Sequence, residues 1–263
     1  MAADLAIVRT QGRYALITAL RTPRTLIFSI IFPLILLVMF NSIFSKGANE
    51  THHFAGHTIT AASYFTAGLA AYSITLTTFT ALVVAITTQR ESGQLKRLRG
   101  TPMPAWTFMV AQIARSLVLA TAMTVALFAL GVIAFHVHLR AASVVGIAVY
   151  LVLGVATMTA LGIALTAFTP TPDAASTIGP FAVVMLSFVS GVFIGVDTLP
   201  NWLETIGKVF PLYHLASGMQ TCLVNGGTGT GVNGSDVLGL VIWGAIGVRI
   251  AMRHFRWEPL SHS

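Results

Sequence analysis

Long stretches without charged side chains constrain this chain more than any other feature of its sequence. Residues 142–168 hold no Asp, Glu, Lys or Arg, and residues 105–135 hold only Arg115. A run of about 18 or more apolar residues is long enough to cross a bilayer as a helix. Only 9% of the 263 residues are charged, whereas a soluble domain averages about 25%. The chain is therefore predicted to be a membrane protein.

The apolar runs predict an all-α polytopic fold with a single transmembrane domain over residues 1–263. Six transmembrane helices are expected at about residues 25–44, 58–88, 105–135, 142–168, 174–196 and 237–252. Residues 4–21 are expected to form an amphipathic helix in the interface, because Arg9 and Arg13 lie one turn apart, away from its apolar residues. Residues 202–209 and 212–224 are apolar but too short to span, which predicts re-entrant external helices.

Basic residues gather on one side of this predicted topology. If the amino terminus is cytoplasmic, the external segments hold three Lys or Arg residues and the cytoplasmic segments hold eleven, namely Arg9, Arg13, Arg21, Arg24, Arg90, Lys96, Arg97, Arg99, Arg249, Arg253 and Arg256. An excess of basic residues marks cytoplasmic segments. Both termini are therefore predicted to be cytoplasmic. The formal charge of +7 is interpreted as an interaction with anionic lipid headgroups rather than with nucleic acid.

The densest charge lies between the second and third predicted spans, in residues 90–102, which we call the basic loop. Leu95 and Leu98 are three residues apart, so a short helix here would have one apolar edge among basic residues. Pro102 and Pro104 would end it before the next span. Charge alone favours an anchor at the lipid headgroups over a docking helix.

The basic loop resembles that of the ABC-2 type permeases, the membrane subunits of bacterial drug, polysaccharide and lipid exporters, including daunorubicin-resistance-type permeases. Their first cytoplasmic loop reads approximately Glu-Arg-Glu-x-Gly-x-Leu-x-x-Leu-x-x-Thr/Ser-Pro. The chain departs from it at Gln89, and it matches at Arg90, Glu91, Gly93, Leu95, Leu98, Thr101 and Pro102. Two further elements of the family pattern are matched by Arg21, Pro23, Phe32 and Pro33 and by Pro211 and His214.

The resemblance implies that the basic loop is a coupling helix resting on a separate nucleotide-binding ATPase subunit. The residues assigned to this coupling are Arg90, Glu91, Gly93, Leu95, Lys96, Arg97, Leu98, Arg99, Thr101 and Pro102. It also implies a second permease copy or paralogue, a bacterial inner-membrane location and export of an amphipathic drug, lipid or glycolipid. On this interpretation the chain is a transport subunit and not an enzyme.

Two faces are candidates for the transport pathway. The second span carries an aromatic and hydroxyl stripe with Phe65, Tyr72, Thr77 and Phe79, and the fifth carries Phe181, Met185 and Phe188 on one face. Aromatic side chains also simply pack, and hydroxyls bond to their own helix, so packing is an equal alternative from the residues alone. The resemblance favours the pathway, because the family builds it from these two spans at a dimer interface.

Several other sites are not expected. No Gly-x-x-x-x-Gly-Lys-Ser/Thr sequence occurs, so the chain is not expected to bind ATP, and residues 229–234 fit Gly-x-Gly-x-x-Gly only outside a strand–helix context. His52, His53 and His57 have no acidic residue directly beside them in the sequence, so no metal site is predicted there. No catalytic residue and no cofactor is predicted either. Arg115 is interpreted as reaching to the headgroups, or else as contacting the amino-terminal helix or a partner subunit.

Two other functions remain as alternatives. The chain could be an ATP-independent carrier or channel, or it could be a structural subunit of a membrane complex.

Overall fold

The computed structural model describes residues 23–44, 51–54, 57–99, 105–195, 200–224 and 229–254. Within these ranges the chain is almost entirely helical, as predicted. The longer elements are α2 (Pro23–Phe44), α3 (Ala61–Thr75), α4 (Ala81–Glu91), α6 (Ala105–Phe135), α7 (Ala141–Thr166), α8 (Pro172–Val189), α10 (Pro211–Thr221) and α11 (Gly234–His254). The shorter ones are β1 (Thr51–Phe54), β2 (His57–Thr60), the π-helix η1 (Leu76–Thr80), α5 (Gln94–Arg99) and α9 (Asn201–Gly207).

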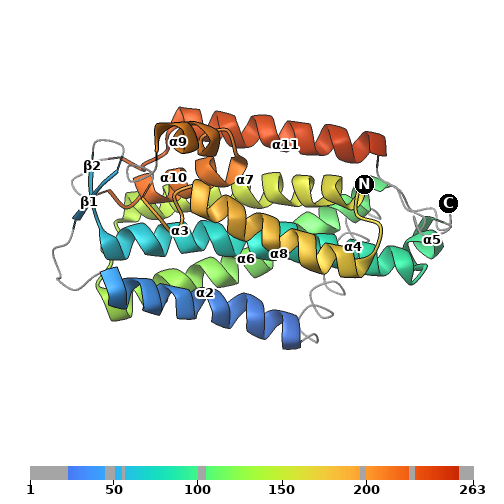
Figure 1. The fold of residues 1–263 in the computed structure, drawn as a ribbon, viewed down its shortest axis with the longest axis horizontal. Helices are drawn as coiled ribbons and strands as arrows, with labels where there is room; N and C mark the ends of the chain where they lie inside the picture. The colour runs from blue at the N-terminus through green and yellow to red at the C-terminus, as the bar shows by residue number, and fades with distance from the viewer. Residues whose placement is uncertain are drawn as a thin grey trace.

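The long helices run side by side and form one bundle (Figure 1). The continuous rod α3–η1–α4 lies at its centre, where α3 contacts α2, α6, α7 and α10, and α4 contacts α7 and α8. The β1–β2 hairpin, α9 and α10 gather at one end of the bundle, and α5 lies at the other (Figure 1). The second predicted span is therefore the inner helix of the bundle.

Helix ends coincide with side chains that cap free backbone groups. The Thr171 hydroxyl accepts a hydrogen bond from the Ala174 N–H at the start of α8, and Pro172 and Asp173 occupy its first turn. This combination of cap, proline and acidic residue favours a helix start. Thr60 caps α3 in the same way through the Ser63 N–H. These caps explain why both helices begin where they do.

The central rod is interrupted by one wider turn. In η1 the N–H of Ala81 donates to the carbonyl of Leu76, five residues back. Neighbouring helices come close here, since a Cβ at Gly162 of α7 would lie 3.1 Å from the Phe79 carbonyl oxygen. Such π turns are frequently found at functional sites. The wide turn thus lies where α7 packs directly on the rod.

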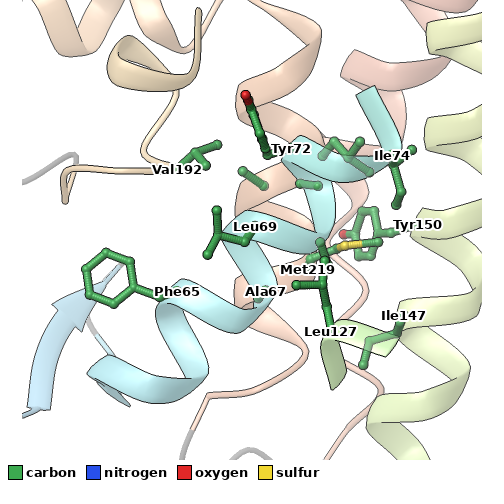
Figure 2. Packing of buried hydrophobic residues seen from close by; sticks show 14 of the residues in the cluster. Phe65, Ala67, Leu69, Tyr72, Ile74, Leu127, Ile147, Tyr150, Val192 and Met219 are labelled. Atoms are coloured by element: carbon green, nitrogen blue, oxygen red, sulfur yellow. The ribbon is translucent and has the colours of Figure 1, made fainter. Parts of the chain in front are cut away.

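The main hydrophobic core surrounds α3. Figure 2 shows Phe65, Leu69 and Tyr72 of α3 with residues from other elements around them, among them Leu127 of α6, Tyr150 of α7 and Met219 of α10. All of these side chains are buried. The short helix α10 is therefore packed into the bundle.

Five helices are long and apolar enough to cross a membrane: α3–η1–α4 as one rod, α6, α7, α8 and α11. In α2, residues Ile31–Phe44 form a shorter apolar helix. These helices confirm the all-α polytopic membrane fold. The predicted interfacial helix at 4–21 lies outside the described residues, and α2 occupies the position of the first predicted span, 25–44.

Two segments differ from the sequence predictions. Residues expected to be a polar loop and the start of the second span form the hairpin, in which Thr51 pairs with Thr60 and Phe54 with His57. Its Thr, Ile and Phe residues favour strands, but four-residue strands are too short to show periodicity. The fifth predicted span extended to residue 196, whereas α8 ends at Val189, and Gly191 adopts a φ of 73° in the turn that follows.

Candidate coupling loop and transport pathway

The basic loop begins with a turn that only glycine adopts without strain. α4 ends at Glu91, and Gly93 has a φ of 70°. The Gly93 N–H donates to the Arg90 carbonyl at 3.1 Å, and the Arg97 N–H donates back to the Gly93 carbonyl at 3.2 Å. Left-handed backbone of this kind is typical of a helix C-cap. The chain thus reverses tightly from α4 into α5.

Arg90 points into the bundle rather than toward solvent. Its side chain is 1% exposed. Nη1 donates to the Thr166 carbonyl at 2.8 Å, and Nη2 donates to the carbonyls of Thr169 and Pro170, the latter at 3.2 Å. These three carbonyls lie at the end of α7 and in the connection to α8. A cation at a helix C-terminus is favourable because the free carbonyls carry partial negative charge.

Leu95 fixes α5 against the same end of the bundle. Its side chain is fully buried. It belongs to a separate small cluster with Leu82 and Ile86 of α4, Ile163 and Ala164 of α7 and Ala251 of α11. Leu95, one of the two residues of the predicted apolar edge, thus anchors the loop in the bundle of its own chain.

Some of the remaining predicted coupling residues are exposed, and the side chains of the others are not among those that the structure describes. Glu91, Lys96 and Arg97 are exposed. Leu98 and Arg99 lie in the last turn of α5, and Thr101 and Pro102 lie outside the described residues. The loop therefore has an inward side, made by Arg90 and Leu95, and a charged outward side.

The candidate pathway residues also fall into two groups. Phe65, Tyr72 and Thr77 are buried inside the chain, and Phe79 is half-buried. In contrast, Phe181 is 65% exposed, and Met185 and Phe188 of α8 are also exposed. The α8 face is open, whereas the α3 stripe is largely covered by the bundle.

Phe193 joins the two groups, and the sequence analysis missed it. Its ring centroid lies 5.3 Å from that of Tyr72 and 5.1 Å from that of Phe188. It also stacks on Phe40 of α2 at 5.6 Å. The turn that carries Phe193 is held by hydrogen bonds from Tyr64 and Gln220 to the Gly191 carbonyl. The sequence placed residue 193 inside a span, so no signal indicated this turn.

A comparison with protein families identifies the chain. The sequence model described as ABC-2 type transporter matches residues 8–224. The chain belongs to the ABC-2 type transporter family. It is therefore a multi-pass membrane protein and a permease component of an ABC-type transporter. Comparison with curated proteins gives no match.

Three hydroxyl groups on the central rod of this ABC-2 permease donate hydrogen bonds within their own helix. Thr66 donates to the Ala62 carbonyl at 2.7 Å, Ser73 to Ala70 at 3.0 Å, and Thr77 to Ser73 at 2.8 Å. These hydroxyls have little remaining capacity to donate to a substrate. The observation favours packing over pathway lining for Thr77.

Arg115 lies in α6 and is partly buried, with its Nε enclosed. The amino-terminal helix that it was suggested to contact is outside the described residues. Within the described parts of the permease, no group of three His, Cys, Asp or Glu side chains could hold a metal ion.

Proposed function

We propose that this permease couples to a separate ATPase subunit through the outward side of the basic loop and exports an amphipathic substrate. The observation that carries the proposal is the division of the loop. Leu95 holds α5 firmly on the bundle, while Lys96 and Arg97 remain exposed beside it. An anchored helix that presents charge can transmit a push, whereas a loose headgroup anchor cannot.

The orientation and assembly complete this proposal. The positive-inside bias places the basic loop and both termini in the cytoplasm of a bacterial cell. Two permease copies, or this chain and a paralogue, would bring two exposed α8 faces together. ATP-driven closure of the two ATPase subunits would push on both loops.

The substrate is proposed to pass beside the aromatic cluster made by Tyr72, Phe188 and Phe193. Their rings form a chain of contacts that runs from the buried Tyr72 through the buried Phe193 to Phe188 on the open face of α8. Apolar and aromatic linings suit drug-like or lipid-like molecules. Phe193→Ala and Tyr72→Ala should lower export at equal expression, and unchanged export of every tested dye and lipid would remove this route.

The first experiment is affinity purification of the tagged chain from membranes in mild detergent. A Walker-motif ATPase should co-purify, and reversal of both charges in Arg97→Glu/Arg99→Glu should weaken its binding about tenfold or more. Asp173→Lys reverses an exposed charge outside the loop and serves as the control. A folded dimer with no bound ATPase would instead favour an ATP-independent carrier.

A further inference from the structure

We infer that Arg90 is a positioning residue that transmits movement of the basic loop to the turn between α7 and α8, and does not itself contact the ATPase. This inference rests on the proposed function, because ATP hydrolysis on a partner supplies the movement. It differs from the expectation implied by the family resemblance, in which Arg90 was one of the residues that couple to the ATPase.

The first argument is the position of the three carbonyls. Thr166 is the last residue of α7, and Thr169 and Pro170 precede Thr171, which caps α8. One guanidinium therefore binds the end of one span and the connection to the next. A displacement of α4 at Arg90 acts directly on the segment that orients both helices.

The second argument is that the turn is also tied to the last turn of α7 by its own hydrogen bonds. The Thr169 hydroxyl donates to the Leu165 carbonyl at 2.9 Å, and the Thr166 hydroxyl donates to the Ile163 carbonyl at 2.6 Å. The Phe168 N–H also donates to the Leu165 carbonyl at 3.0 Å. A segment tied to the helix in this way is expected to move together with the end of α7.

The third argument is a second attachment from the same loop to the same helix end. Leu95 shares its buried cluster with Ile163 and Ala164, in the last turn of α7. Arg90 and Leu95 thus hold α7 from both sides of the Gly93 turn. The loop cannot shift relative to the end of α7 without breaking one of these contacts.

The choice of arginine fits this role. A planar guanidinium presents donors in a fixed fork and can bind several carbonyls at once, whereas a lysine ammonium is a compact point charge. Arg90→Gln removes both the charge and the fork. Arg90→Lys keeps the charge and tests whether the fork is required.

The test uses the complete permease–ATPase complex, with spin labels on cysteines introduced as Val118→Cys and Asp173→Cys in a Cys222→Ser background. Both labelled positions are exposed, and residue 173 lies just after the turn. The distance between labels is measured without nucleotide and with ATP and vanadate. With Arg90 present, nucleotide should shift this distance, and Arg90→Gln should abolish the shift.

Three controls separate the outcomes. Co-purification of the ATPase should be retained in Arg90→Gln but weakened in Arg97→Glu/Arg99→Glu, whereas a docking role for Arg90 predicts weaker co-purification in both variants. If Arg90→Gln does not fold, Arg90→Lys should fold and reduce the shift. A merely structural role would lower thermal stability and leave the nucleotide-driven shift intact.

The inference would be overturned by release of the ATPase in Arg90→Gln, or by an undiminished shift in both Arg90 variants. A wild-type complex that binds the ATPase but shows no shift would also overturn it. Failure of wild-type permease to bind any ATPase is a different result, because it removes the proposed function itself.

Discussion

Gly93 shows how one residue determines the geometry of the basic loop. Its φ of 70° is in the left-handed region, and an L side chain there costs about 1–2 kcal/mol. A Cβ at this position would meet no neighbouring atom. The cost of a substitution would therefore come from the backbone alone.

Gly93→Ala should lower the melting temperature slightly and misplace α5, so that ATPase co-purification falls more than stability does. Gly229→Ala is a matched control, because a Cβ at Gly229 also meets open space and the residue lacks a positive φ. Equal effects of both variants in co-purification would show that the Gly93 turn is not required.

Asp236 holds two side chains of α10 from the first turn of α11. The carboxylate is 3% exposed. It accepts a hydrogen bond from the Ser217 hydroxyl at 3.1 Å and lies 3.1 Å from Nδ1 of His214. The position also favours an acid, since a helix N-terminus carries partial positive charge.

Asp236→Ala should cost about 1–3 kcal/mol, because it leaves buried polar groups of His214 and Ser217 without their acceptor. The measurement is the melting temperature in detergent, which should fall by several degrees. Asp173→Ala removes an exposed acid from the first turn of α8 and should have a smaller effect. An equal change in both variants would contradict a structural role for the buried cluster.

At the level of elements, α7 and α11 pack through small residues. The Thr157 hydroxyl donates to the Leu240 carbonyl at 2.9 Å. A Cβ at Gly247 would lie 2.9 Å from the Ala160 carbonyl carbon, which is backbone. A Cβ at Gly244 would lie 3.2 Å from a side-chain oxygen of Thr157. Small residues at such contacts let membrane helices approach closely.

Gly247→Ala should therefore destabilise the permease by about 1–3 kcal/mol through overpacking. Gly244→Ala should cost less, since a side chain can adjust where a backbone cannot. Comparing their melting temperatures tests the packing of α7 on α11. A larger loss for Gly244→Ala would show that the spacing of these helices is set elsewhere.

The sequence predicted the long helices well and the short elements poorly, for physical reasons. An apolar run such as 142–168 can satisfy its backbone in a bilayer only as a helix, so its state does not depend on neighbours. The hairpin, the early end of α8 and the wide turn η1 depend on packing with other segments. No local sequence pattern at Phe193 predicts the early end of α8, and none at Leu76 predicts the wide turn.

The candidate site was predictable in outline only. The three-residue spacing of Leu95 and Leu98 among basic residues indicated a short helix with one apolar edge. The sequence could not indicate that Arg90 faces inward, because its acceptors are backbone carbonyls 76 to 80 residues away. Every residue has a backbone carbonyl, so the residue types at positions 166, 169 and 170 do not reveal that their carbonyls bind Arg90.

At the scale of the whole molecule, the bundle has two chemically different ends. One end carries the exposed charges of α5, and the other carries α9, α10 and the hairpin (Figure 1). The proposed orientation assigns these ends to the cytoplasm and the exterior. This assignment can be tested without knowledge of the substrate.

Single cysteines introduced as Gln94→Cys and Asn201→Cys, in a Cys222→Ser background, should react from opposite sides of the membrane. Both positions are exposed. A membrane-impermeant maleimide applied to intact cells should label residue 201 and should label residue 94 only after permeabilisation. Labelling of residue 94 in intact cells would reverse the proposed orientation.

The wide turn η1 determines the direction in which α4, the half of the central rod that carries Arg90, faces. A π turn contains one residue more than an α turn, and each residue rotates a helix by about 100°. Leu82, Ile86 and Arg90 recur every four residues and are all buried, so they share one face whose direction depends on that extra residue.

Deleting Thr77 should convert the rod to continuous α-helix and turn this face by about 100°, away from the α7–α8 turn. Arg90 would lose its three carbonyls and Leu82 its cluster, so the deletion should lower the melting temperature far more than Thr77→Ala, which keeps the residue count. Equal stability of the two variants would contradict this. The number of residues in η1 thus sets how the two halves of the rod are rotated relative to each other. A change of one residue in length at this point replaces every side chain on the buried face that follows with a neighbour from another face.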